Sequence, residues 1–168
     1  CHTIGDAAVS IALKAIGEAQ KEENNYELRH VLTHLQLADK EDYRLFRENN
    51  IIAAVQTFWH YKEPGFYEKI EIPALGKERC EKMYPLKSLR DNGAIITCSG
   101  DYPVSSVNNP LLGIQMGITR NDPDAEDMDK QEYLLNAQER LSLAEMIEAY
   151  TANGAYQLFR EGKTGTLK

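Results

Sequence analysis

Residues 93–104 read GAIITCSGDYPV, and this stretch decides the fold class. Its segment 94–97 is a short apolar run with β-branched residues, which predicts a buried strand. Apolar character without alternation is typical of a parallel strand that is covered on both faces. The carboxylate of Asp101 follows at the exit of this strand, where α/β folds place their chemistry. Taken alone, Asp101 is more simply interpreted as a turn residue or a helix N-cap.

Two earlier runs also have the character of strands. Residues 28–35 read as a short strand that closes on His34, and residues 51–57 form the most strand-like run in the chain. Apolar spacing and turn residues predict helices over residues 6–21, over 40–48 with Asp39 as the N-cap, and over 77–90. This alternation predicts βαβ units, and therefore a parallel sheet with right-handed crossovers.

The second half of the chain is expected to be mainly helical. A helix should follow residues 108–110, and residues 121–129, of which five are acidic, are expected to form a solvated surface loop. Ser142 and Glu145 have the spacing of a capping box, which predicts a helix running to Tyr150. The Asn153-Gly154 pair is expected to break that helix.

Composition excludes several classes of protein. The 168 residues suffice for one domain with a real core. A net charge of -7 argues against nucleic acid as a partner, and no apolar run approaches the ~20 residues of a membrane span. Cys1, Cys80 and Cys98 show no CxxC spacing, so neither a disulfide framework nor a cysteine zinc site is expected. We therefore expect reduced conditions and a cytoplasmic location.

Polar residues that suit a metal stand at three expected strand ends, namely His2, His34 and Asp101. Two imidazoles and one carboxylate suit zinc or another borderline divalent metal with open positions. Such a metal lowers the pKa of its bound water toward ~7, and a nearby carboxylate can take and return the proton. The spacing alone leaves the matter open, because no HExxH-type pattern is present and lone histidines are commonly packed or surface residues.

Four segments together carry a family resemblance: residues 1–6 (CHTIGD), 29–34 (RHVLTH), 55–57 (VQT) and 99–104 (SGDYPV). Their combination resembles the amidohydrolase superfamily, and specifically its YtcJ-like branch, with His-x-Ile-Gly-Asp, Arg…His and Ser-Asp-x-Pro-Val segments. Residues 84–89 (YPLKSL) and 149–155 (AYTANGA) also match that branch. The resemblance covers essentially the whole chain.

The resemblance implies an α/β fold of the TIM type, a distorted (β/α)8 barrel with the metal at its C-terminal mouth. It implies that His2 ends strand five and His34 ends strand six, each as a metal ligand. Residues 51–57 would be strand seven, and Asp101 would end strand eight as metal ligand and general base. Three further residues fall in loops that could line the substrate pocket, against ordinary packing or surface roles: Gln56, His60 and Arg120.

The chain also departs from the family pattern. The strand-one His-x-His pair and the strand-four Lys or Glu ligand are absent, and a complete barrel needs ~200 residues or more. Gly100 separates Ser99 from Asp101 where many relatives have Ser-Asp adjacent, which leaves the base assignment open. The chain opens at Cys1 without an initiator Met. We therefore expect residues 1–168 to be the C-terminal half of a barrel, about strands five to eight with their helices, without the N-terminal half-barrel and the small β-domain.

The expected parent is a metal-dependent hydrolase of small molecules, acting on C–N bonds other than peptide bonds, in an amide or cyclic amide. The cofactor would be a divalent metal, zinc by preference, and the isolated fragment would be inactive. One alternative is an inactive regulatory or binding protein on an amidohydrolase-like barrel, since fold does not fix function. Another is a small doubly wound domain without metal, although no glycine-rich phosphate loop follows a strand. Expected partners are the missing half of the barrel and further copies of the fragment, because an open parallel sheet leaves unpaired edges.

Overall fold

A computed structural model describes residues 1–106, 108–127 and 130–167. Four parallel strands form one sheet in the order β1-β2-β3-β4, as the sequence predicts. The strands are β1 (His2–Thr3), β2 (Val31–His34), β3 (Ile52–Val55) and β4 (Ile95–Cys98). Because neighbouring strands are parallel, all four carboxyl ends lie at one edge of the sheet, where the predicted ligands stand.

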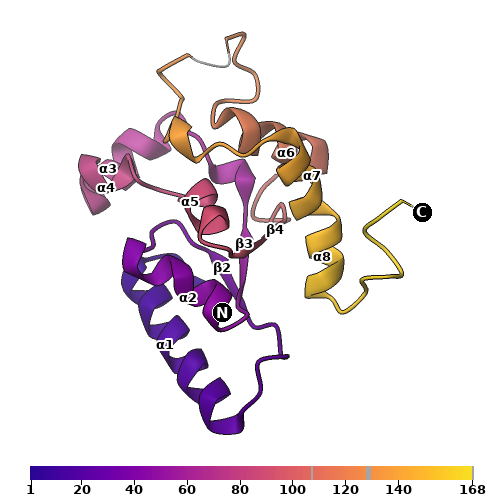
Figure 1. Cartoon of the computed structure of the whole chain (residues 1–168). Helices are drawn as coiled ribbons and strands as arrows, with labels where there is room; N and C mark the ends of the chain where they lie inside the picture. Colours follow the sequence, from indigo (N-terminus) through magenta and orange to yellow (C-terminus); the bar gives the residue numbers. More distant parts are fainter. Residues whose placement is uncertain (107, 128–129, 168) are drawn as a thin grey trace.

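Helices connect the strands in the predicted alternation. The connections are α1 (Asp6–Glu23), η1 (Lys40–Asp42) with α2 (Tyr43–Glu48), and α5 (Leu86–Asp91), which leads into β4. Between β3 and α5 the chain forms η2 (Thr57–Trp59), the π-helix η3 (Tyr67–Glu71), α3 (Ile72–Leu75) and α4 (Lys77–Cys80). Figure 1 shows α1 and α2 at the β2 end of the sheet and α6 to α8 at the β4 end.

One face of the sheet forms the main core. Leu32, Ala53 and Ile96 lie side by side in register, and all three are buried. They pack against fully buried side chains of α1 and α2, including Leu13 and Phe46. Burying one such large side chain stabilises the fold by about 1.5 to 3 kcal/mol. This packing explains why the inward positions of this face are apolar in each strand.

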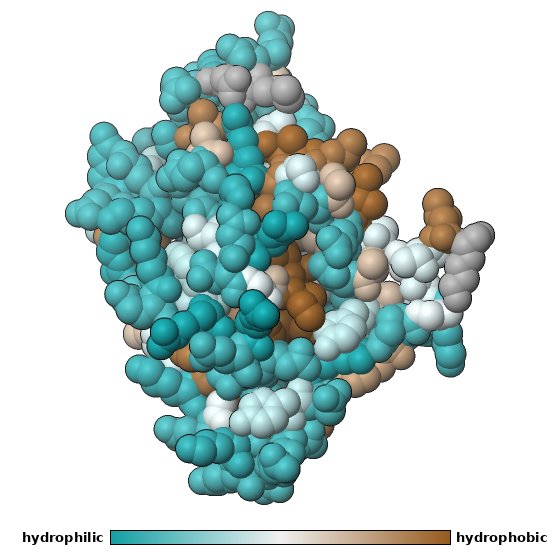
Figure 2. Space-filling view, viewed as in Figure 1, coloured by the Kyte–Doolittle hydropathy of each residue, from teal (hydrophilic) through white to brown (hydrophobic). Residues whose placement is uncertain are grey.

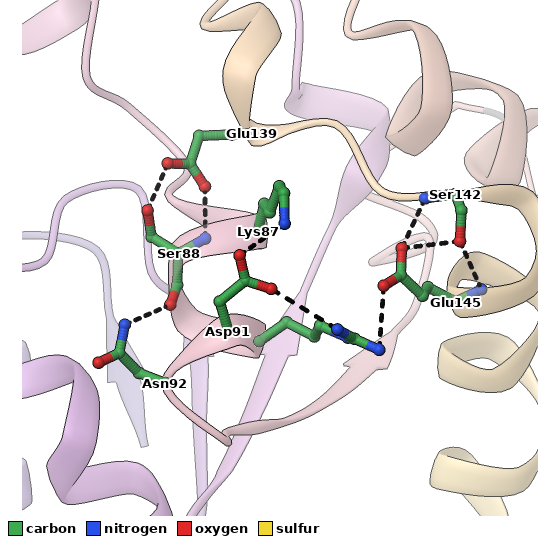
Figure 3. A network of polar contacts seen from close by, with 8 residues as sticks. Lys87, Ser88, Asp91, Asn92, Glu139, Ser142 and Glu145 are labelled. Atoms are coloured by element: carbon green, nitrogen blue, oxygen red, sulfur yellow. Dashed lines mark hydrogen bonds and ion pairs between the residues drawn. The ribbon is translucent and has the colours of Figure 1, made fainter.

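Three helices follow β4: α6 (Pro110–Thr119), α7 (Leu143–Tyr150) and α8 (Ala152–Gln157). The predicted helix after residues 108–110 and the Ser142–Glu145 capping box are both confirmed. Side-chain hydrogen bonds tie this part to α5, because Glu139 accepts from Ser88 N and Oγ, and Arg90 pairs with Glu145 at 3.0 Å. Figure 3 shows the Glu139 carboxylate against Ser88 of α5 and the Glu145 carboxylate beside Ser142 at the start of α7.

Apolar side chains also remain on the surface of this second half. Figure 2 shows them gathered over α6 and α7 and toward β4, with hydrophilic residues around them. Leu111, Leu143 and Ile147 are among the exposed large apolar residues of these helices. Within the described part of the chain, no helix has the length and apolar character that crossing a membrane requires.

Several predicted boundaries are wrong. The helix expected over 77–90 is interrupted at Tyr84, which has a φ of +55° and donates its backbone N–H to Gln36 O. The break expected at Asn153-Gly154 lies at Thr151, and both residues belong to α8. Asp39 precedes η1 without a side-chain capping bond. The acidic segment is irregular over 121–127 as predicted, and residues 128 and 129 lie outside the described residues.

Candidate metal centre

The sheet brings two of the predicted ligands, His2 and His34, into contact. Parallel pairing sets His2 opposite Thr33 and Thr3 opposite His34. The two imidazoles meet edge to face, with His34 Nε2 at 2.8 Å from His2 Nδ1. His34 is buried at 4% exposure, whereas His2 is exposed. The strand register therefore produces a pair of facing ring nitrogens at the carboxyl edge of the sheet.

Gln56 fixes the protonation pattern of His34. The carbonyl Oε1 of Gln56 can only accept, so the 2.8 Å contact places a hydrogen on His34 Nδ1. The amide nitrogen of Gln56 donates to Thr33 Oγ1 at 3.3 Å and Ser99 Oγ at 3.1 Å, which orients the amide group. With its hydrogen on Nδ1, a neutral His34 accepts at Nε2 the 2.8 Å hydrogen bond from His2 Nδ1. Metal-binding histidines are held in this way, by a second residue on the other ring nitrogen.

Trp59 holds the face of the same imidazole. Its ring stacks on His34 with centroids 5.1 Å apart and an interplanar angle of 14°. The indole N–H donates to Ser105 Oγ at 3.1 Å, which fixes the indole in turn. Because Trp59 is the only tryptophan in the sequence, its fluorescence reports directly on the surroundings of His34.

Asp101, the third predicted ligand, lies just beyond β4 with a φ of +51°. Its backbone carbonyl accepts from Val104 and Ser105, and its carboxylate makes no hydrogen bond or ion pair with the described residues. Among those residues, no three His, Cys, Asp or Glu side chains form a metal-binding group. The described residues thus bring two imidazoles together, and a metal site of three or four ligands would need further donors.

His60 and Arg120 lie together in the interior, and neither side chain reaches solvent. Arg120 donates from Nη1 to His60 Nδ1 at 2.8 Å, from Nε to Leu135 O and from Nη2 to Met83 O. Both side chains are thus packed in the interior of this chain, and their expected place in a substrate pocket stays a prediction. Gln56, the third such residue, is also buried and contacts His34 rather than solvent.

Electrostatics keep this interior pair singly charged. Burial, together with the neighbouring Arg120 cation, lowers the pKa of His60 well below its ordinary value. Burial also lowers the pKa of Arg120 to about 9, so its guanidinium remains charged at neutral pH. Because a guanidinium only donates, His60 Nδ1 accepts, and the ring hydrogen lies on Nε2. Within the described structure, His60 Nε2 has no hydrogen-bond partner.

A cavity of about 510 Å³ lies on the other side of Trp59, the residue that stacks on His34. Its walls include Ile4, two residues after His2, and Gln36, two residues after His34. Trp59 contributes to both the cavity and the stack on His34. The sequence indicates an aromatic segment around Trp59 but gives no signal for this cavity, which depends on segments brought together by the fold.

The fold and this site define a class: a partial barrel of parallel strands whose carboxyl ends carry a pair of imidazoles. The model of the Amidohydrolase family matches residues 1–168, and the chain therefore belongs to that family. It is 28% identical over 166 residues to YtcJ of Bacillus subtilis (strain 168), whose name places it among the amidohydrolases. The match covers 99% of this chain and 29% of that protein.

Two solved structures share the fold. An uncharacterized metal-dependent hydrolase from Pyrococcus furiosus is 23% identical, with a TM-score of 0.68. A second, from Pyrococcus horikoshii OT3, is 19% identical, with a TM-score of 0.74. Each match covers 99% of this chain and 30% of the other. The chain spans less than a third of the length of these relatives, and the predicted partial amidohydrolase barrel is confirmed. Which strands of the barrel it supplies remains a prediction.

Proposed function

We propose that the chain supplies metal ligands to a metal-dependent hydrolase of C–N bonds other than peptide bonds, in a small amide or cyclic amide. The observation that carries this proposal is the pair of facing ring nitrogens of His2 and His34, 2.8 Å apart, with His34 held by Gln56. Membership of the Amidohydrolase family supports the reaction class. The same geometry disfavours the alternative of an inactive binding protein, which has no need of an oriented imidazole pair.

Each residue of the site has a role in this proposal. His2 and His34 would hold the divalent metal, zinc by preference, because imidazole suits zinc. The bound metal would supply Lewis acidity and a water whose pKa is lowered toward ~7. Asp101 would take a proton from the attacking water and return it to the leaving nitrogen as the C–O bond forms and the C–N bond breaks. This role requires the loop after β4 to bring the carboxylate beside the imidazole pair.

The proposal includes partners. Additional metal donors would come from further strands of the barrel, since the chain spans less than a third of its relatives. Strands β1 and β4 are at the edges of the sheet, and exposed strand edges favour association. We therefore expect copies of this chain to self-associate, and a strictly monomeric mass by light scattering at tens of micromolar would contradict this. Free Cys1, Cys80 and Cys98 suit a reducing compartment, so we propose the cytoplasm, which cell fractionation tests.

Metal content after zinc loading and dialysis tests the central claim. We expect about one zinc per chain, because two oriented imidazoles are already assembled. The zinc should be lost in His2→Ala and in His34→Ala. His30→Ala is the matched control, since this histidine lies on the same segment but outside the pair, and it should retain the metal. Zinc that persists in His34→Ala would refute metal binding by this pair, whereas zinc that the unmodified chain never retains would show that donors from the further strands are needed first.

A further inference from the structure

The cavity beside Trp59 has largely apolar walls. They include the side chains of Ile4, Trp59, Phe66, Ile70, Leu75 and Tyr84. A volume of about 510 Å³ lies within the usual range of roughly 300 to 1,000 Å³ for small-molecule sites. The wall residue Trp59 stacks on His34, so a molecule in the cavity lies against the indole that separates it from this imidazole. The cavity is therefore positioned to hold the part of a substrate that extends away from the reacting bond.

One buried acid, Glu71 at the end of η3, lines this apolar cavity. Its side chain is 8% exposed, and Oε1 accepts a hydrogen bond from Gln36 Nε2 at 2.7 Å. It forms no ion pair within the described part of the chain, and the nearby titratable groups, Glu63, Tyr67, Cys80 and Tyr84, supply no cation. Burial raises the pKa of Glu71 to about 6, so at neutral pH the group is still mainly ionised.

An ionised carboxylate with a single neutral hydrogen bond is costly in such surroundings. Its second oxygen is available to a donor inside the cavity, and a cationic donor offsets the cost best because the hydrogen bond is then charge-assisted. The walls around it favour aromatic or aliphatic groups, which gain free energy by leaving water. The cavity thus combines an apolar surface with one buried carboxylate, whereas its other acid, Glu63, is exposed.

We propose that this cavity binds an apolar arm of the substrate that ends in an ammonium group, and that Glu71 receives the ammonium. The substrate class of the hydrolase is then an amide or cyclic amide with an amine-bearing aromatic or aliphatic substituent. This inference rests on the proposed function for the reacting bond, but the recognition of the amine depends only on the cavity and Glu71. A neutral or anionic arm of the same shape lacks the ionic contact and binds more weakly.

Three probes of similar shape test the charge preference in the metal-free chain. Phenethylamine is a cation at neutral pH, 2-phenylethanol is neutral and 3-phenylpropionate is an anion. Binding is measured by calorimetry and by the fluorescence of Trp59, the sole tryptophan, which lines the cavity. We expect the ammonium to bind about tenfold or more tightly than the alcohol, and the carboxylate to bind most weakly. Equal affinities, or tighter binding of the carboxylate, would overturn the proposal.

Two variants then assign the preference to one residue. Glu71→Gln keeps the acceptor for Gln36 and should reduce the ammonium-to-alcohol ratio to about one, while the affinity for the alcohol stays within about twofold. Glu63→Gln, an exposed carboxylate of the same cavity, should keep the preference. A preference that survives Glu71→Gln refutes the role of Glu71. Zinc retention is measured separately, so zinc that persists in His34→Ala beside an intact ammonium preference refutes only the proposed function, and zinc lost in His34→Ala without an ammonium preference refutes only this inference.

Discussion

Replacement of Gln56 tests the candidate metal centre through the hydrogen bond that orients the His34 imidazole. Gln56→Leu removes the acceptor of the His34 Nδ1 hydrogen, whereas Gln56→Glu supplies a carboxylate acceptor at the same position. We expect the leucine variant to bind divalent metal more weakly, and the glutamate variant to bind it as tightly as the wild type or more tightly. Metal affinity should therefore fall in one variant and hold or rise in the other, although both substitutions act on the same hydrogen bond to His34.

The magnitude follows from the contacts of Gln56. The hydrogen bond to His34 is 2.8 Å long, and Gln56 is only 3% exposed, so water cannot readily replace the lost acceptor. A buried donor left without a partner costs about 1 to 3 kcal/mol. Loss of such an orienting partner weakens metal binding by roughly 10- to 100-fold. The hydroxyls of Thr33 and Ser99 accept from Gln56 at 3.3 and 3.1 Å, and these longer bonds add less.

Quenching of Trp59 fluorescence by Co²⁺ provides the assay. Trp59 is the only tryptophan of the chain and its ring lies 5.1 Å from the His34 ring, so a paramagnetic ion at the pair quenches it efficiently. Gln115→Leu is the control, because this exposed glutamine donates to Pro123 O and, among the described residues, contacts neither Gln56 nor the histidine pair. Equal Co²⁺ affinity in Gln56→Leu and the wild type would refute the reasoning. So would weaker binding by Gln56→Glu than by Gln56→Leu.

Three further substitutions test other parts of the structure. Glu71→Gln should raise the free energy of unfolding at pH 7 by about 1 to 2 kcal/mol, because burial raises the pKa of Glu71 to about 6. Between the ordinary pKa and about 6, the folded state then binds more protons than the unfolded chain, so the wild type loses stability as the pH rises through that window. Urea unfolding at several pH values should show no such loss in the variant. Gly113→Ala should cost about 1 to 3 kcal/mol in urea unfolding, since its Cβ would lie 2.8 Å from Tyr150 Cζ, whereas Gly154→Ala, with open space around its Cβ, should stabilise. Arg29→Ala removes a guanidinium that stacks on Tyr156 and pairs with Glu161, and amide exchange in residues 152–161 should accelerate; unchanged exchange would contradict this link.

Local sequence predicted the strands because buried strands consist of apolar residues, which can be recognised without knowledge of their partners. The apolar runs around Ile52 and Ile96 need cover on both faces, and the alternation with helices implies parallel pairing. The run over 28–35 was predicted too long, because Leu28 is exposed and Arg29 has a φ of +50° before pairing begins at Val31. The residue at which a strand ends depends on the neighbouring strand with which it pairs, and local sequence does not identify that neighbour.

The wrong helix boundary at Tyr84 has a non-local cause. The backbone N–H of Tyr84 bonds to Gln36, and the carbonyl of Met83 accepts from Arg120 and Asn136. Pro85 follows directly and has no N–H to donate within a continuing helix. The apolar spacing of 77–90 alone suits one helix, but these distant contacts take the backbone groups that such a helix would use.

The candidate site divides in the same way. His2 and His34 were predicted from their position at strand ends, and the strand register alone brings them together. Asp101 depends on the conformation of a loop, which no periodicity in the sequence describes. No sequence pattern indicates a role for Glu71, because its position in the wall of an apolar cavity depends on Gln36 and Trp59, which are remote in sequence.

Arg120 and His60 show how interior residues can act on a site that they do not enter. Arg120 links the backbone of Met83 and Leu135 to the His60 ring, and that ring stacks on Tyr84 with centroids 4.4 Å apart. Tyr84 is a wall of the cavity, and Trp59, the residue before His60, stacks on His34. A buried cation is tolerated only where its hydrogen bonds are well formed. The Arg120–His60 cluster therefore fixes the positions of Tyr84 and Trp59, the two cavity residues that it adjoins. Loss of ligand affinity after replacement of Arg120 would therefore report a displaced wall and not a lost contact with the ligand.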